Sequence, residues 1–119
     1  MGNFRNLLIW QKSMVLVTKI YEVTQAFPKE EAYGLTSQIR RCSVSIPSNI
    51  AEGYGRGGDI ELKRFFGITL GSLFELQTQI EIAYNIKYID EATFKKLYEN
   101  TRELEIMLMS FINKIKHDS

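Results

Sequence analysis

The fold is decided by residues 94–115, which read FKKLYENTRELEIMLMSFINKI. Positions spaced three and four residues apart in this stretch are nearly all apolar: Phe94, Leu97, Thr101, Leu104, Leu108, Phe111 and Ile115. This period is typical of a helix with one face on a hydrophobic core. Asp90 is a suitable N-cap, and Ile89 can pack on Phe94 as a hydrophobic staple. The pattern predicts a helix over residues 90–116.

The same period recurs in two earlier segments. A helix over residues 60–86, with Asp59 as its N-cap, is indicated by Leu62, Phe66, Thr69, Leu73, Leu76, Ile80 and Ala83. A helix over residues 5–25 is indicated by Leu7, Trp10, Met14, Val17 and Tyr21. It should end before Pro28, because a residue that precedes proline is disfavoured in the helical conformation.

The segment over residues 34–55 contains a proline, Pro47, within a helical pattern. An interior proline costs about 3 kcal/mol in an unsupported helix. The apolar spacing nevertheless continues in phase across it, through Leu35, Ile39, Cys42, Ile46 and Ile50. We therefore expect one kinked helix, followed by a turn at Gly53, Gly55, Gly57 and Gly58, which supply caps.

Four amphipathic helices with short connections predict an all-α fold, an antiparallel up-down-up-down four-helix bundle. At 119 residues, of which 45% are hydrophobic, we expect a single domain over residues 1–119. Cys42, the only cysteine, cannot pair within the chain, which fits a reducing compartment. No stretch approaches the roughly 20 apolar residues of a membrane span, so we expect a cytoplasmic protein.

A polar stripe follows the expected helix over residues 34–55. Its members fall three or four residues apart: Gln38, Arg41, Ser45, Asn49, Glu52 and Arg56. A solvated face is one interpretation. Serine, asparagine and glycine are poor helix formers, however, which favours specific hydrogen bonds in assembly. On the second interpretation, Asn49 and Glu52 are at least partly buried and hydrogen-bonded.

Small residues mark the helix expected over residues 60–86. Gly67 and Gly71 lie one turn apart, followed by Ser72 and Glu75. Each interior glycine costs about 1 kcal/mol relative to alanine, so a compensating close approach of another backbone is expected. We interpret Gly71, Ser72 and Glu75 as assembly residues, with tight packing either within the chain or between subunits.

The usual parts of a catalytic or metal site are missing from the sequence. The only histidine is His117, near the end of the chain, and no base accompanies Ser45 or Ser48. The stretch from Gly53 to Gly58 lacks the lysine and hydroxyl residue of a phosphate-binding P-loop. We therefore expect no enzyme, no cofactor and no metal. Five aromatic residues could stack on unpaired bases, but most of them lie at helical spacing with apolar neighbours, so core or interface roles are expected: Trp10, Tyr21, Tyr33, Tyr54 and Tyr84.

Several strings in the chain together resemble one known family. They are Trp10-Gln11-Lys12, Phe27-Pro28, the run from Gly34 to Arg41, the run from Ser45 to Gly53 with Arg56, and Gly71-Ser72-Leu73 with Glu75. This pattern is similar to that of the four-helix-bundle proteins encoded in bacterial 23S ribosomal RNA intervening sequences. The resemblance implies a bacterial homopentamer. It also implies similarity to the accessory variability proteins of diversity-generating retroelements, which associate with a reverse transcriptase and its RNA.

Two functional hypotheses follow. The first is an RNA-associated accessory protein, for which a local basic patch is available: Arg40, Arg41, Arg56, Lys63 and Arg64. The second is a structural or protein-interaction module that binds no nucleic acid. Fifteen basic and fourteen acidic residues give a net charge of only +1, so there is no global attraction to RNA. The two hypotheses differ in whether the arginines pair with acidic residues of the same chain.

Overall fold

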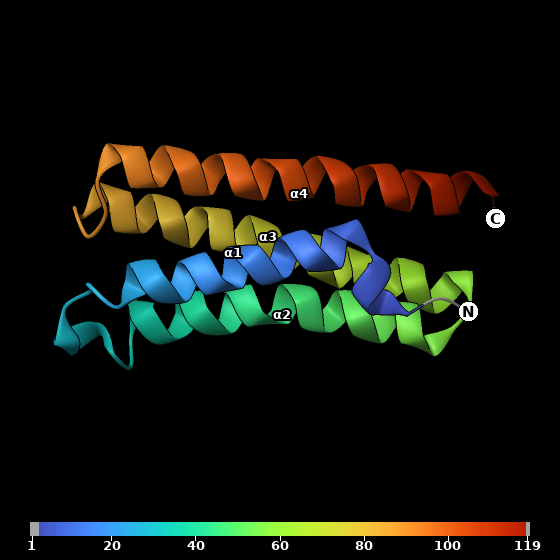
Figure 1. Cartoon of the computed structure of the whole chain (residues 1–119), viewed down its shortest axis with the longest axis horizontal. Coiled ribbons are helices and arrows are strands. Elements are labelled where there is room, and N and C mark those ends of the chain that lie inside the picture. The colour runs from blue at the N-terminus through green and yellow to red at the C-terminus, as the bar shows by residue number, and fades with distance from the viewer. Residues whose placement is uncertain (1–2, 119) are drawn as a thin grey trace.

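The computed structural model describes residues 3–118, which measure 46 × 22 × 20 Å. Within this range the chain forms four α-helices: α1 (Leu8–Thr24), α2 (Leu35–Arg56), α3 (Asp59–Asn85) and α4 (Glu91–Asp118). Two short 3-10 helices, η1 (Phe4–Asn6) and η2 (Lys29–Glu31), precede α1 and α2. Successive helices run in opposite directions, and the two ends of the chain lie at the same end of the bundle (Figure 1). The predicted all-α, up-down-up-down four-helix bundle is confirmed.

Helix α2 passes through Pro47 without interruption, as the in-phase apolar spacing predicted. Side chains around the proline bond back to carbonyls of their own helix. The Ser45 hydroxyl donates to the Cys42 carbonyl at 2.6 Å, and the Ser43 hydroxyl to the Arg40 carbonyl at 2.8 Å. The Asn49 side-chain amide donates to the Ser45 carbonyl at 2.8 Å. Part of the polar content of α2 is therefore used within the helix, next to the position where proline lacks an N–H.

The predicted apolar stripes of α2, α3 and α4 form the core. Their central members, among them Ile46, Phe66, Leu73 and Leu108, have no exposed surface. At the beginning of α4, the Asp90 carboxylate accepts a hydrogen bond from the Thr93 backbone N–H at 2.8 Å, which confirms the predicted cap. Helix period and capping chemistry thus specify the inward faces of these three helices.

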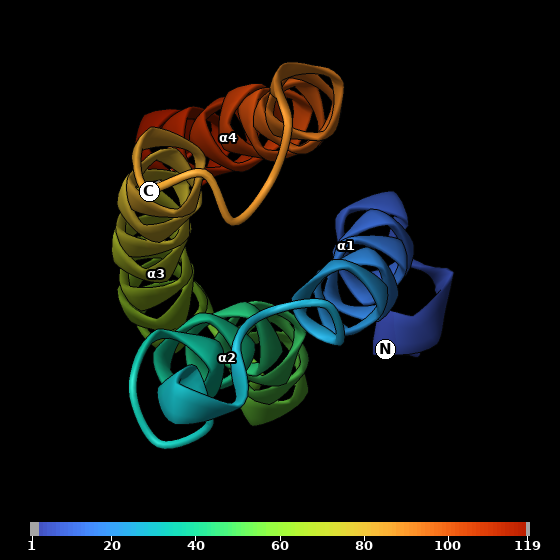
Figure 2. The same cartoon turned by 90° about the vertical axis from the view of Figure 1, so that its left-hand side faces the viewer.

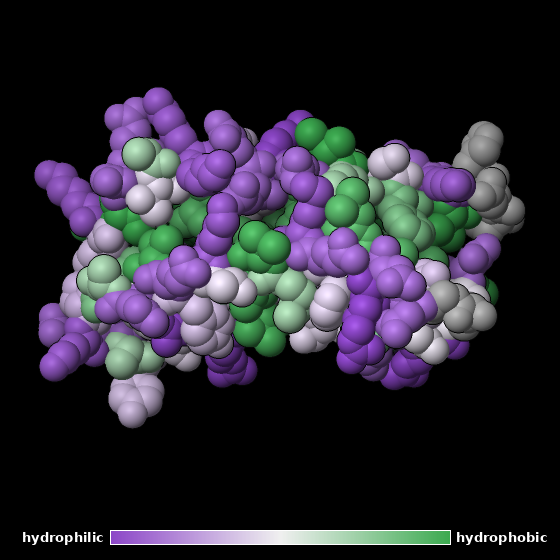
Figure 3. All heavy atoms as spheres, viewed as in Figure 1, coloured by the Kyte–Doolittle hydropathy of each residue, from purple (hydrophilic) through white to green (hydrophobic). Residues whose placement is uncertain are grey.

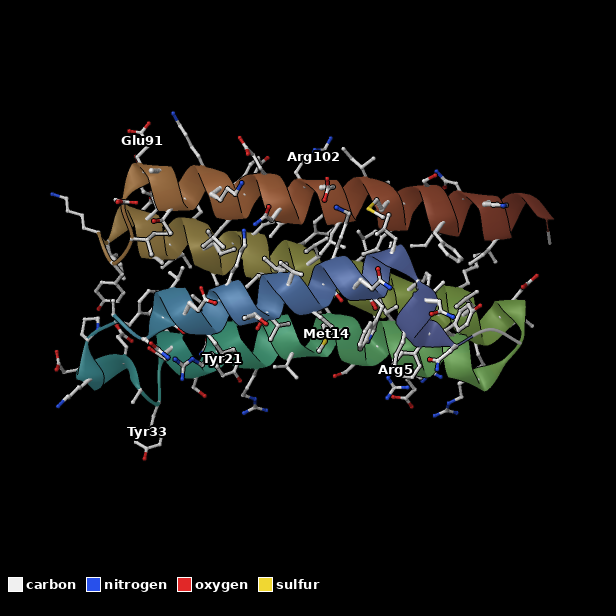
Figure 4. The ribbon with its side chains drawn as sticks, viewed as in Figure 1. Arg5, Met14, Tyr21, Tyr33, Glu91 and Arg102 are labelled. Atoms are coloured by element: carbon white, nitrogen blue, oxygen red, sulfur yellow. The ribbon has the colours of Figure 1, made fainter. Side chains whose placement is uncertain are left out.

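The prediction for the inward face of α1 was wrong. Met14 and Tyr21 are exposed (Figure 4), and the core face of α1 consists of Ile9, Ser13, Leu16, Ile20 and Thr24. Two of these are polar, but each hydroxyl is satisfied locally. Ser13 donates to the Trp10 carbonyl and Thr24 to the Ile20 carbonyl, both at 2.7 Å. Because this bonding removes the cost of burying a hydroxyl, the polar residues occupy core positions and an adjacent apolar stripe faces outward.

Two of the four glycines expected to end α2 instead belong to it. The helix ends at Arg56, and the turn is made by Gly57 and Gly58, whose positive φ values of 68° and 110° favour glycine. Gly58 also occupies the N-cap position of α3, which had been assigned to Asp59. Asp59 is the first helical residue, where its negative charge suits the positive end of the helix dipole.

At the opposite end of the bundle, the connection before α2 bonds to the connection before α4. The Tyr88 hydroxyl donates to one Glu31 carboxylate oxygen at 2.7 Å, and the Leu35 backbone N–H donates to the other at 3.1 Å. Both bonds stabilise the carboxylate form and hold the pKa of Glu31 below its usual range. The same carboxylate raises the pKa of Tyr88. Glu31 thereby links the two connections and satisfies a backbone donor at the start of α2.

The helix interfaces differ in how closely they are packed. Between α2 and α3, a Cβ built on Gly53 would lie 2.6 Å from the Phe65 Cβ, so the helices can meet there only because position 53 is glycine. Between α1 and α4, by contrast, a cavity of about 660 Å³ opens near the chain ends, with walls that include Leu7, Leu62, Met107 and Phe111. Figure 2 shows α1 and α4 set apart at one side of the bundle. Apolar side chains gather along this side (Figure 3).

Candidate functional site

A polar groove of about 520 Å³ lies between α2 and α3, and we call it the α2–α3 groove. It brings together five of the residues predicted from the polar stripe and the small-residue segment: Gln38, Arg41, Ser45, Ser72 and Glu75. They meet because positions 38, 41 and 45 share one face of α2, and positions 72 and 75 share the face of α3 beside it. The remaining walls come from Tyr33, Ser37, Cys42 and Gln79.

Arg41 and Glu75 give the groove two opposite charges that do not neutralise each other. Both side chains are exposed. Among residues 3–115, whose side chains the structure describes, Arg41 makes no hydrogen bond, ion pair or ring contact, and no cation lies within ion-pair distance of Glu75. The groove therefore offers one unpaired cation and one carboxylate to a ligand that carries complementary groups.

Cys42 lies in the wall of the groove as a protonated thiol. Its Sγ donates to the Ser72 carbonyl at 3.0 Å and so joins α2 to α3. Burial, with a further contribution from the nearby Glu75 carboxylate, raises the pKa of Cys42 to about 12. Nucleophilic cysteines depend on the thiolate, which is not formed near neutral pH at such a pKa. Cys42 is therefore protonated near neutral pH and serves as a contact between α2 and α3.

Gln79 is a groove residue that the sequence interpretation missed. The residue is only 8% exposed, and its Oε1 has no hydrogen-bond donor within the described part of the chain. A buried acceptor without a partner costs about 1–3 kcal/mol. Position 79 follows Glu75 by one helical turn, and this spacing is the signal that could have added it to the predicted polar face.

Tyr33 is one of the residues that line the groove, and its ring lies in solvent. The residue is 99% exposed, and Figure 4 shows its side chain pointing away from the helices. Tyr33 is therefore not one of the aromatic residues that serve the core of this chain. A free aromatic face beside a polar groove is a place where a planar group can stack.

Three members of the predicted stripe lie outside the groove, towards the end of α2. Asn49 is half-buried and bonded within its helix, as expected. Glu52 is exposed, which contradicts the prediction that it is partly buried, and its carboxylate pairs with Arg56 at 2.8 Å. The polar stripe therefore divides into two parts. Its residues in the first half of α2 line the α2–α3 groove, and those near the end of α2 include a solvated ion pair.

Of the five cations predicted for nucleic-acid contact, three have partners within the chain and two do not. Arg40 donates to the Thr24 hydroxyl at 2.8 Å and lies over the Tyr21 ring, 4.6 Å from its centroid. Arg64 pairs with Glu61 at 3.0 Å and, like Arg56, lies over the Phe65 ring. Arg41 and Lys63 are the two that are exposed and have no partner among the side chains of residues 3–115.

Gly67 and Gly71 are exposed, and a Cβ at either position would meet no atom within 4 Å. The option that these glycines allow close packing within the chain was therefore wrong. Packing between subunits stays a prediction. Phe74 and Ile82, which follow on the same helix, are also exposed. This face of α3 therefore exposes two large apolar side chains beside two glycines.

The described residues hold no cluster of three or more histidine, cysteine, aspartate or glutamate side chains suited to a metal ion. His117 lies outside the side chains that the structure describes. Within the described residues there is also no helix that combines the length and the apolar character needed to cross a membrane.

Comparison with known proteins adds two findings. Residues 5–110 match the model of a family described as 23S rRNA-intervening sequence protein. The fold is similar to the crystal structure of a protein of unknown function from the S23 ribosomal protein family of Bacteroides thetaiotaomicron. The TM-score is 0.82 at 20% sequence identity, over 88% of this chain and 98% of the other. No curated protein matches the chain.

Proposed function

The chain belongs to the 23S rRNA-intervening sequence protein family, and on this premise we propose that it is a non-enzymatic, oligomeric accessory protein that associates with RNA. The observation that carries the proposal is the pair of free cations on α2 and α3. Arg41 and Lys63 are exposed and have no partner among the described residues, so both can contact phosphate. The names of the family and of its structural relative, which refer to ribosomal RNA and to a ribosomal protein, support the same direction.

The absence of catalysis is part of the proposal. The α2–α3 groove contains one thiol, and its raised pKa keeps it protonated. The serines near it donate to backbone carbonyls or lack a neighbouring base, as with Ser45, which donates to the Cys42 carbonyl. A protein of this kind would act by binding, in the cytoplasm, next to RNA or to a reverse-transcriptase-like protein partner.

Assembly into a homopentamer is also proposed. The exposed face of α3 with Gly67 and Gly71 would allow the backbone of a second copy to approach closely, and Phe74 and Ile82 would be buried by that contact. The number five rests on the family resemblance. Light scattering should return about five times the chain mass of 13.8 kDa, and a monomer mass at micromolar concentration would contradict the proposal.

The test of RNA association is the salt dependence of binding to structured ribosomal RNA. Phosphate contacts release counterions, so log affinity should fall linearly with log salt, with a slope of about 0.7 per contact on single strands. Lys63→Ala should lower this slope by the amount of one phosphate contact, about 0.7. Arg64→Ala is the matched control on the neighbouring residue, because its guanidinium is already paired with Glu61, and it should change the slope less. Absence of binding by the assembled oligomer at low salt would refute the proposal.

A protein-interaction module is the second candidate. It is favoured by the engagement of Arg40, Arg56 and Arg64 within the chain, which reduces the positive potential available to RNA. Recovery of the native complex from cells separates the two candidates. Co-purifying RNA that resists removal by moderate salt supports the first, and a protein partner without RNA supports the second.

A further inference from the structure

We propose that the cavity between α1 and α4 binds a free aliphatic carboxylate, with the hydrocarbon chain inside the cavity and the carboxylate at Lys114. The volume of about 660 Å³ falls in the range of roughly 300–1,000 Å³ that is usual for small-ligand sites. This cavity shares no described lining residue with the α2–α3 groove. A ligand bound here is therefore independent of any association with RNA.

The walls of the cavity suit a hydrocarbon chain. Apolar side chains from α1, α3 and α4 form most of the lining, among them Leu8, Leu62, Ile106, Met107 and Phe111. All of these except Phe111 are aliphatic or thioether side chains, and none offers the hydrogen bonds that a polar ring needs. Leu8 of α1 and Ile106 of α4 are each 55% exposed, so apolar surface at the cavity stays in contact with water. An alkyl chain that covers this surface is stabilised by the hydrophobic effect.

One free cation belongs to the lining. Lys114 is exposed and makes no hydrogen bond, ion pair or ring contact among the side chains of residues 3–115. Ser110 and Phe111 lie one helical turn before it and line the same cavity, so the three residues share one face of α4. The Lys114 ammonium can therefore form a charge-assisted hydrogen bond with the head group of a ligand whose chain lies against this face.

Asp59 is the acidic residue of the lining, and its effect on an anion is reduced by its position. It is the first residue of α3, where the positive end of the helix dipole offsets part of its charge. The N-cap, Gly58, has no side chain to accept from the first N–H groups of α3. Arg5 and Lys63, close in sequence to lining residues, are exposed and have no acidic partner among the described residues. This excess of positive charge favours a carboxylate over an ammonium head group.

The test measures binding of hexanoate, octanoate and decanoate to the assembled protein by isothermal titration calorimetry, at concentrations at which each acid is monomeric. Affinity should rise about fourfold for each added methylene, the factor expected when a CH₂ group is buried. Octanol should bind about twofold to fivefold more weakly than octanoate, because it lacks the exposed ion pair with Lys114. Octylamine should bind more weakly than octanol, because its charge has the same sign as Lys114.

A substitution that fills the cavity tests where the chain lies. Ser110 is an exposed lining residue, and Ser110→Trp should place a ring in the cavity without removing a core side chain. It should weaken decanoate by more than about tenfold, the loss of roughly two buried methylenes. Asn113→Trp is the matched control, because Asn113 is exposed on the same helix and is not among the described lining residues. It should leave the affinity unchanged.

A second substitution tests the head group and does not depend on the folding of Ser110→Trp. Lys114→Met keeps an unbranched side chain but removes the charge, so it should weaken octanoate by about twofold to fivefold and leave octanol unchanged. Lys95→Met removes the same charge near the beginning of α4, far from the cavity along the helix, and should change neither ligand.

Four outcomes would overturn the inference. An affinity that does not depend on chain length, or that Ser110→Trp leaves unchanged, shows that the chain does not enter the cavity. Equal losses of octanoate and octanol in Lys114→Met remove the ion pair. Binding to phosphatidylcholine vesicles without saturable binding of free decanoate assigns the apolar surface to a membrane. A change of oligomeric mass in Ser110→Trp but not in Asn113→Trp assigns the cavity to a contact between subunits.

Discussion

The α2–α3 and α1–α4 interfaces of the bundle are packed by different means. At the first, Gly53 lets the two helices come so close that a methyl group would meet the Phe65 Cβ at 2.6 Å. At the second, apolar side chains of α1, α3 and α4 surround a cavity of about 660 Å³, and an ion pair between Lys12 and Glu103 bridges the helices at 2.8 Å. The comparison indicates that the fold depends mainly on the α2–α3 interface, while the α1–α4 interface tolerates change.

The largest expected contrast comes from one substitution made at two positions of α3. Leu73 is completely buried, and Leu73→Ala should lower the free energy of unfolding by about 2–5 kcal/mol. Leu62 is half-buried and lines the α1–α4 cavity, so Leu62→Ala should cost distinctly less. Urea denaturation at one fixed protein concentration measures both. Equal losses would contradict the difference between the interfaces.

A smaller but opposite pair of effects is expected from two glycines of α2. Gly53→Ala should destabilise the protein by about 1–3 kcal/mol, because the added methyl forces α2 and α3 apart. The Cβ that Gly55→Ala adds would meet no atom within 4 Å, so this substitution should stabilise the helix by up to about 1 kcal/mol. Thermal denaturation should therefore move in opposite directions for the two variants. A gain in stability from Gly53→Ala would show that the α2–α3 interface can relax.

The thiol that joins α2 to α3 predicts an alkaline effect. The pKa of Cys42 is raised from 9.0 to about 12, so above pH 9 the unfolded chain releases a proton that the folded chain retains. The contribution of Cys42 to stability is therefore complete below about pH 9 and falls as pH rises towards 12. The stability difference between the natural protein and Cys42→Ala should shrink over this range. A difference that is constant with pH would contradict burial of the thiol.

The smallest expected effect concerns the hydrogen bond between Tyr88 and Glu31, which joins the connection before α4 to the connection before α2. Because the pKa of Glu31 is lowered in the folded chain, Glu31 contributes to folding stability above the usual carboxylate pKa. This contribution is lost as pH falls through the pKa of Glu31 in the folded chain. Tyr88→Phe removes one of the two bonds and should shift acid unfolding slightly towards neutral pH. Tyr98→Phe is the control, because the Tyr98 hydroxyl makes no hydrogen bond within the described residues. Identical acid midpoints for the two variants would refute the link.

The sequence was sufficient for the fold because three helices carry an unbroken apolar period. Leu73, Leu76 and Ile80, for example, recur at helical spacing and are all buried. The inward face of α1 could not be predicted from the apolar period. Ser13 and Thr24 satisfy their hydroxyls on their own helix, and this makes a polar residue acceptable in the core while Met14 stays outside. A prediction from periodicity considers only the spacing of apolar residues. It therefore cannot detect hydrogen bonds that allow a polar residue into the core.

The candidate site was only partly predictable. Helical spacing indicated that Arg41 and Ser45 share one face of α2, but it did not show that this face lies beside Glu75 of α3. It could not show which cations have partners in three dimensions, since Arg40 reaches Tyr21 and Thr24 on another helix. Nor could it show that the Gln79 oxygen is buried without a donor, because burial depends on how closely the helices pack in three dimensions.

The position of the chain ends has a practical consequence. Asn3 and Asp118 lie at the same end of a bundle about 46 Å long, and Tyr33 lies at the opposite end (Figures 1 and 4). A fluorescent reporter or surface tether fused at either terminus would therefore emerge far from Tyr33 and leave that end accessible.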